Sequence, residues 1–147
     1  MGFLLDTSAI NRICRRQANA DRWRPAFITD VVLRELCATQ DRDLRRQLLG
    51  VLDGRLGPGG ILRSERPIGH YGPGAALGHH QPLRLGRIFP LITRAIGSSF
   101  RRHWPDGFIA QVAIQYGLTL VTADRKLARA AREFGATVEF ISRSAPP

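Results

Sequence analysis

The chain has 147 residues and a mass of 16.3 kDa, a length that fits a single domain. It is 44% apolar and 23% charged, and no apolar run approaches the roughly 18–20 residues of a membrane helix, so we expect no membrane-spanning segment. Lys and Arg outnumber Asp and Glu by 22 to 12, a net charge of +10 that favours phosphate-rich partners.

The N-terminus carries no recognisable sorting signal. Its apolar stretch, Phe3–Leu5, is short and ends at Asp6, which fits neither a secretory signal nor a myristoylation motif. We therefore expect a cytoplasmic protein. Cys14 and Cys37 form no C-x-x-C pair, which argues against zinc fingers and disulfide scaffolds and favours buried structural thiols.

The first third of the chain alternates short apolar runs with amphipathic stretches. Asp6 and Thr29 are suited to cap the helices that follow them. The expected elements are strands over 3–5 and 26–28 and helices from Asp6 through Cys14, from Asp30 to about Ala38, and over 41–52.

The middle of the chain has a different composition. Residues 54–86 hold 9 of the 15 glycines and 4 of the 9 prolines. A short strand at Ile61–Leu62 fits there, but most of this stretch predicts a loop. We expect one domain over residues 1–147 with an irregular segment at about 57–82. A helical pattern returns over 83–97, although Pro90 interrupts it.

The last third predicts regular structure throughout. Pro105 and Asp106 are expected to open a helix that carries Tyr116 on its apolar face and stops at Gly117. A buried strand over 118–121, a helix over 124–134 and a closing strand over 137–141 follow. This alternation of strands and helices predicts an α/β fold whose sheet is mostly parallel, with helices on both faces.

Four acidic residues stand out by position. Asp6 and Asp124 each come just after a predicted buried strand, at the sheet edge where ligands bind in open α/β folds, although N-capping also favours aspartate there. Asp106 lies in the first turn of its helix. Glu35 follows Val31 and Val32 at helical spacing and so shares their apolar face, where a salt bridge to an arginine is the alternative reading.

These four acids come from separate elements and would meet at one sheet edge. Four close carboxylates repel one another unless a cation neutralises them. Oxygen ligands alone suit Mg²⁺ or Mn²⁺, the metals of metal-assisted phosphodiester hydrolysis.

The chain resembles the PIN-domain ribonucleases, and most closely the VapC-like toxins of bacterial toxin–antitoxin pairs. The resemblance is carried by three segments: Leu4-Leu5-Asp6-Thr7-Ser8-Ala9, Val32-Leu33-Arg34-Glu35-Leu36, and Asp106-Gly107-Phe108-Ile109-Ala110 with the following Gly117-Leu118-Thr119-Leu120-Val121-Thr122-Ala123-Asp124.

The resemblance implies a three-layer α/β/α sandwich around a five-stranded parallel sheet. It also implies a metal-dependent endoribonuclease that leaves 5′-phosphate ends, is held inactive by a cognate antitoxin and forms dimers. By motif, the acids that would hold Mg²⁺ or Mn²⁺ and act in catalysis are Asp6, Glu35, Asp106 and Asp124, with Ser8 and Thr122 as accessory hydroxyls.

Arginines near these acids in the sequence are candidates to hold the RNA backbone, although each also fits an ordinary surface charge. They are Arg12, Arg15, Arg16, Arg101, Arg102 and Arg125.

Two departures from the family leave other functions open. Many members carry a further acid two residues past the last aspartate, where this chain has Lys126, and the segment over 57–82 is unlike the usual short connection. A catalytically inactive RNA-binding PIN-like module and a non-enzymatic partner module therefore remain alternatives. A phosphatase of the haloacid dehalogenase type is disfavoured because it needs a second aspartate where Ser8 stands.

Overall fold

The computed structural model describes residues 2–16, 18–62 and 82–142. The strands are β1 (Phe3–Leu5), β2 (Ala26–Thr29), β3 (Leu56–Leu62), β4 (Thr119–Thr122) and β5 (Val138–Phe140). The helices are α1 (Thr7–Cys14), α2 (Asp30–Cys37), α3 (Arg42–Leu52), α5 (Pro82–Ile96), α6 (Phe100–Tyr116) and α7 (Arg125–Glu133).

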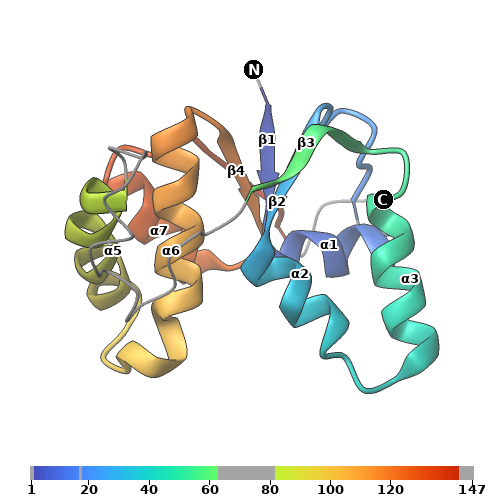
Figure 1. The fold of residues 1–147 in the computed structure, drawn as a ribbon, viewed down its shortest axis with the longest axis horizontal. Helices are drawn as coiled ribbons and strands as arrows, with labels where there is room; N and C mark the ends of the chain where they lie inside the picture. The colour runs from blue at the N-terminus through green and yellow to red at the C-terminus, as the bar shows by residue number, and fades with distance from the viewer. Residues whose placement is uncertain (1, 17, 63–81, 143–147) are drawn as a thin grey trace.

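The strands form one five-stranded sheet in the order β3-β2-β1-β4-β5, and every pairing is parallel. The α1, α2 and α3 helices lie on one side of the sheet, and α6 and α7 lie on the other, with α5 packed against them (Figure 1). This arrangement confirms the expected three-layer α/β/α sandwich. From β1, the strands β2 and β3 follow on one side of the sheet, whereas β4 and β5 lie on the other side of β1. The strand order therefore reverses between β1 and β4, which is the topological switch point.

The strands form because short apolar runs are buried on both faces. Leu4, Leu5, Ile28 and Leu120 are completely buried, and they join a core to which the helices of both layers contribute. The α1 and α2 helices each follow a capping residue whose side chain accepts a hydrogen bond from a backbone N–H of the first turn, as the sequence predicts. Asp6 accepts from Ala9 and caps α1, and Thr29 accepts from Val32 and caps α2.

β3 is longer than the predicted strand at Ile61–Leu62, since it begins at Leu56 and includes Gly-Pro-Gly-Gly. As an edge strand it tolerates a proline, which cannot donate to a sheet ladder. A Cβ on Gly57 would lie 2.8 Å from the Cβ of Pro25, so glycine permits the close approach there. The segment expected to be irregular over about 57–82 is therefore a strand as far as Leu62. Residues 63–81 lie outside the described part.

The α6 helix begins at Phe100, five residues before the predicted start at Pro105. Phe100 and Trp104 both contact the ring of Phe89 on α5 edge-to-face, and this packing favours helix in the turn before the proline. Tyr116 is 54% exposed and does not share the buried face that its spacing predicts. The sequence also predicts buried cysteines, but Cys37 is exposed and Cys14 is half-buried.

No described helix combines the length and the apolar character that crossing a bilayer would require.

Candidate functional site

Asp6 lies at the centre of the candidate site, directly after β1 at the switch point of the sheet. Its side chain is almost completely buried, at 3% exposure. The carboxylate accepts hydrogen bonds from the hydroxyl of Thr122 at 2.5 Å, the hydroxyl of Ser8 at 2.7 Å and the backbone N–H of Ala9 at 2.8 Å. Asp6 therefore caps α1 and is also held by two hydroxyl groups.

The two hydroxyls form a small network that joins β1 to β4. The Ser8 and Thr122 hydroxyl oxygens are 3.1 Å apart, and each also accepts a backbone N–H from the turn after β4, Ser8 from Ala123 and Thr122 from Asp124. The turn that carries Asp124 is therefore fixed by the same hydroxyls that hold Asp6. Both residues are where the sequence predicts accessory hydroxyls.

Asp124 caps α7, as the sequence reading also allows. Its Oδ1 atom accepts the N–H groups of Lys126 and Leu127. Burial is the largest cause of a shift that raises the pKa of Asp6 to about 6, against the hydrogen bonds that lower this pKa. The charge of Asp124 also raises it, so the two carboxylates interact at the sheet edge.

Asp106 is the most strongly perturbed acid of the site. It lies in α6, and its side chain makes no hydrogen bond or ion pair with any described residue. Burial and then the charges of Asp6, Asp124 and Glu35 raise its pKa to about 7. The four acids predicted from separate elements therefore share one electrostatic neighbourhood.

Glu35 differs from the prediction in its surroundings. The spacing places it on the apolar face of α2, but the residue is exposed, whereas Val31 and Val32 are buried. Leu36, which follows Val32 at helical spacing, is buried as well, so the buried face of α2 runs through Val32 and Leu36 and Glu35 lies beside it. The Oε2 atom of Glu35 accepts a hydrogen bond from the hydroxyl of Thr7 at 2.5 Å, and Glu35 makes no ion pair with a described arginine. Sequence reasoning did not single out Thr7, which has no signal beyond its place beside Asp6.

The donor chemistry of the site fits a hard divalent cation. Carboxylate oxygens repel one another here, and no described side chain compensates the charge of the partly buried Asp106. Within the described residues, however, no three Asp, Glu, His or Cys side chains gather closely enough to form a ready-made metal site. The four carboxylates therefore surround one negative region without converging on a single point.

The candidate arginines lie within α1, just after it, and in the first turns of α6 and α7. Arg15 and Arg16 follow the last turn of α1, whose eight residues place them about 12 Å from the helix start at Asp6. Arg12 is half-buried nearer to that start. Arg101 and Arg102 are exposed in the first turn of α6, before Asp106, and Arg125 directly follows Asp124.

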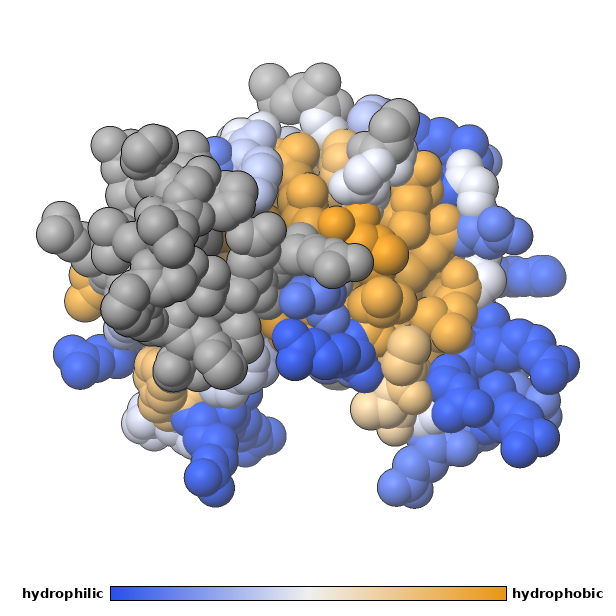
Figure 2. Space-filling model, in the orientation of Figure 1, coloured by the Kyte–Doolittle hydropathy of each residue, from blue (hydrophilic) through white to orange (hydrophobic). Residues whose placement is uncertain are grey.

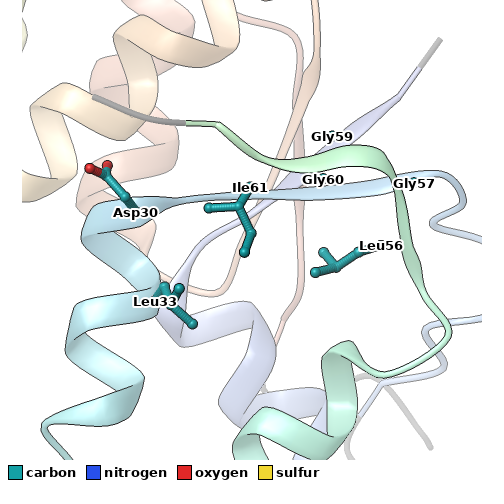
Figure 3. Close-up of a pocket in the computed structure, with 7 residues that line it drawn as sticks. All are labelled: Asp30, Leu33, Leu56, Gly57, Gly59, Gly60 and Ile61. Carbon is teal, nitrogen blue, oxygen red and sulfur yellow. The ribbon is translucent and has the colours of Figure 1, made fainter. Parts of the chain in front are cut away.

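A separate hollow of about 520 Å³ lies at the sheet edge beside β3. Figure 3 shows Leu33, Leu56 and Ile61 pointing into it, with Asp30 at one end. It opens on an apolar area of the face that carries β3, whereas hydrophilic side chains cover α3 (Figure 2). None of the four acids lines this hollow, so it is distinct from the carboxylate site.

No protein-family model matches the chain, and no curated protein matches it by sequence. Solved structures do match. The crystal structure of PAE2754 from Pyrobaculum aerophilum has a TM-score of 0.54 and 21% identity, over 94% of this chain and 90% of that one. FitAcB from Neisseria gonorrhoeae has a TM-score of 0.54 and 21% identity, over 92% of this chain and 95% of that one.

A third match is VapBC-5 from Mycobacterium tuberculosis, described as a member of the VapBC family of toxin–antitoxin systems. It has a TM-score of 0.52 and 23% identity, over 96% of this chain and 98% of that one. The matches span nearly the whole length of both chains, so the described fold is the one that the resemblance to PIN-domain proteins implies.

Proposed function

We propose that the protein is a metal-dependent endoribonuclease and the toxin of a toxin–antitoxin pair. The observation that carries the proposal is the shared negative neighbourhood of four acids at the switch point of the sheet, in which burial and the other three acids raise the pKa of Asp106 to about 7. A divalent cation would neutralise this region and let an anionic phosphodiester approach.

The proposed mechanism assigns the four acids as ligands of Mg²⁺ or Mn²⁺. When bound, the metal would lower the pKa of a water molecule and stabilise the charge that develops on the phosphate. Asp6 is kept in place by Ser8 and Thr122, so its carboxylate enters the site already oriented. Thr7 orients Glu35 toward the same region. Exposed arginines, among them Arg101 and Arg102, would hold the RNA backbone.

Isothermal titration calorimetry tests whether the four acids bind the metal. Mn²⁺ and Mg²⁺ should bind the wild-type protein and bind Asp106→Asn at least tenfold more weakly, because the variant loses one ligand charge. Asp21→Asn is a matched control, since Asp21 is an exposed aspartate paired with Arg24. Equal affinity of Asp106→Asn and the wild type would remove Asp106 from the metal site.

The toxin and partner assignments are supported by the structural match to VapBC-5, a member of the VapBC family of toxin–antitoxin systems. Expression in a bacterial host should arrest growth, and co-expression of the product of a short reading frame next to the gene should relieve the arrest. A protein that cuts RNA in vitro but does not slow growth would contradict the toxin assignment and leave the nuclease in place. We also propose that the protein acts in the cytoplasm and forms a homodimer. Light scattering on the purified protein, which measures its mass in solution, tests the homodimer.

A further inference from the structure

Beside the carboxylate site, Arg125 lies over the ring of Phe140. The guanidinium carbon of Arg125 lies 6.0 Å from the centre of the Phe140 ring, within the range of a cation–π contact. Arg125 is the first residue of α7 and directly follows Asp124, whereas Phe140 ends β5. The pair therefore joins the turn after β4 to the end of the neighbouring strand.

The position of this pair relates it to the candidate site. Phe140 is the register partner of Thr122 in the parallel pair of β4 and β5. The hydroxyl of Thr122 holds the carboxylate of Asp6. Because adjacent strands lie about 4.8 Å apart, the aromatic residue is one strand spacing from the residue that fixes Asp6.

The surroundings of Arg125 differ from those of the next arginine along the helix. Arg129 pairs with Glu133 one turn further on, as exposed helical arginines commonly do. Arg125 is exposed and makes no ion pair with a described acidic residue, although Asp124 adjoins it in sequence. Its guanidinium group lies instead over a half-buried aromatic ring.

We propose that Arg125 and Phe140 form a subsite that stacks an unpaired RNA base next to the cleaved phosphodiester. Proteins that recognise single-stranded RNA stack splayed bases on aromatic rings and on arginine guanidinium planes. Here Phe140 supports the guanidinium from one side and the base stacks on Arg125. The inference rests on the proposed nuclease function, and it specifies the substrate: the cut lies beside an unpaired base rather than within a duplex.

The test uses short RNAs with 2-aminopurine at each position in turn along the whole strand, bound to the full-length Asp6→Asn variant. One position adjacent to the cut should show strong fluorescence quenching. In the same background, Arg125→Lys keeps the charge but removes the planar group, so it should abolish most of that quenching and weaken binding by roughly tenfold. Phe140→Leu should reduce both effects, and Arg129→Lys should change neither.

Two results would overturn the subsite. One is the absence of position-specific quenching in the Asp6→Asn parent, and the other is unchanged quenching and affinity in Arg125→Lys. If the wild type cuts RNA normally in either case, only the subsite fails. If the wild type cuts no RNA while Arg125→Lys still loses the quenching, the nuclease proposal fails and the base-stacking site remains.

Discussion

Thr122 donates a hydrogen bond of 2.5 Å to the carboxylate of Asp6, across 116 residues of sequence. Thr122 ends β4, Asp6 directly follows the neighbouring parallel strand β1, and both residues are buried. The contact ties the acid at the centre of the proposed site to the strand and turn that present Asp124. The Thr122 hydroxyl therefore links the two acids, together with the hydroxyl of Ser8.

Replacement of Thr122 by Val should destabilise the protein by about 1–3 kcal/mol, because the buried Asp6 loses a donor and the N–H of Asp124 loses an acceptor. Thr122→Ser should recover most of this free energy of unfolding, as measured by urea denaturation. Thr93→Val is the matched control, since Thr93 is equally buried but bonds only the carbonyl of Phe89. It should leave Mn²⁺ affinity unchanged, whereas Thr122→Val should lower it. Equal metal affinity of both variants would contradict the role of Thr122.

The metal-free protein should lose stability as pH rises through the range in which Asp106 and Asp6 ionise. Their pKa values in the folded protein are about 7 and about 6, above the ordinary value of 3.8. The folded state therefore holds more protons than the unfolded state between these values, so the stability contribution is complete at low pH and declines on the way to neutral pH.

Other carboxylates also titrate, so the measurement is a comparison with Asp106→Asn. The free energy of unfolding of the wild type should fall more steeply between about pH 4 and about pH 7 than that of the variant, since these are the ordinary and the raised pKa of Asp106. Saturating Mg²⁺ should flatten the wild-type profile, because a cation compensates the ionised carboxylates. Parallel profiles for the two metal-free proteins would contradict the raised pKa of Asp106.

Gly107 permits the close approach of α6 and α5 next to Asp106. A Cβ at this position would lie 2.2 Å from the hydroxyl oxygen of Thr93 and 3.0 Å from its backbone nitrogen. Gly107→Ala should therefore destabilise the protein by about 1–3 kcal/mol through overpacking. Gly50 in α3 has no atom within 4 Å of the added Cβ, so Gly50→Ala should stabilise by about 0.5–1 kcal/mol. Thermal unfolding that shifts in the same direction for both variants would contradict this packing account.

The sequence was sufficient to predict most of the fold, because the strands and helices near the site have strong local signals. Short apolar runs end at capping residues such as Asp6 and Thr29, and the structure uses both as caps. The convergence of Asp6 and Asp124 was predictable as well, since both follow parallel strands.

Other features depended on contacts distant in sequence. The early start of α6 depends on the packing of Phe100 and Trp104 against Phe89, a contact that local spacing does not encode. The exposure of Glu35 depends on how α2 packs, since its buried face runs through Val32 and Leu36 and leaves Glu35 beside it. Nearness in sequence was also a poor guide for Arg15 and Arg16, because α1 carries them to its far end.

The most direct test of the account is the cleavage of a labelled, structured RNA by the purified protein in Mg²⁺, in Mn²⁺ and in EDTA. Asp6→Asn and Asp124→Asn serve as comparisons, since asparagine can still cap both helices. We predict cutting that requires the metal and falls at least a hundredfold in both variants while their circular dichroism stays native. Undiminished cutting by both variants would contradict the carboxylate mechanism. RNA binding without cutting in any metal would instead support the inactive RNA-binding module, with Lys126 as the first residue to replace.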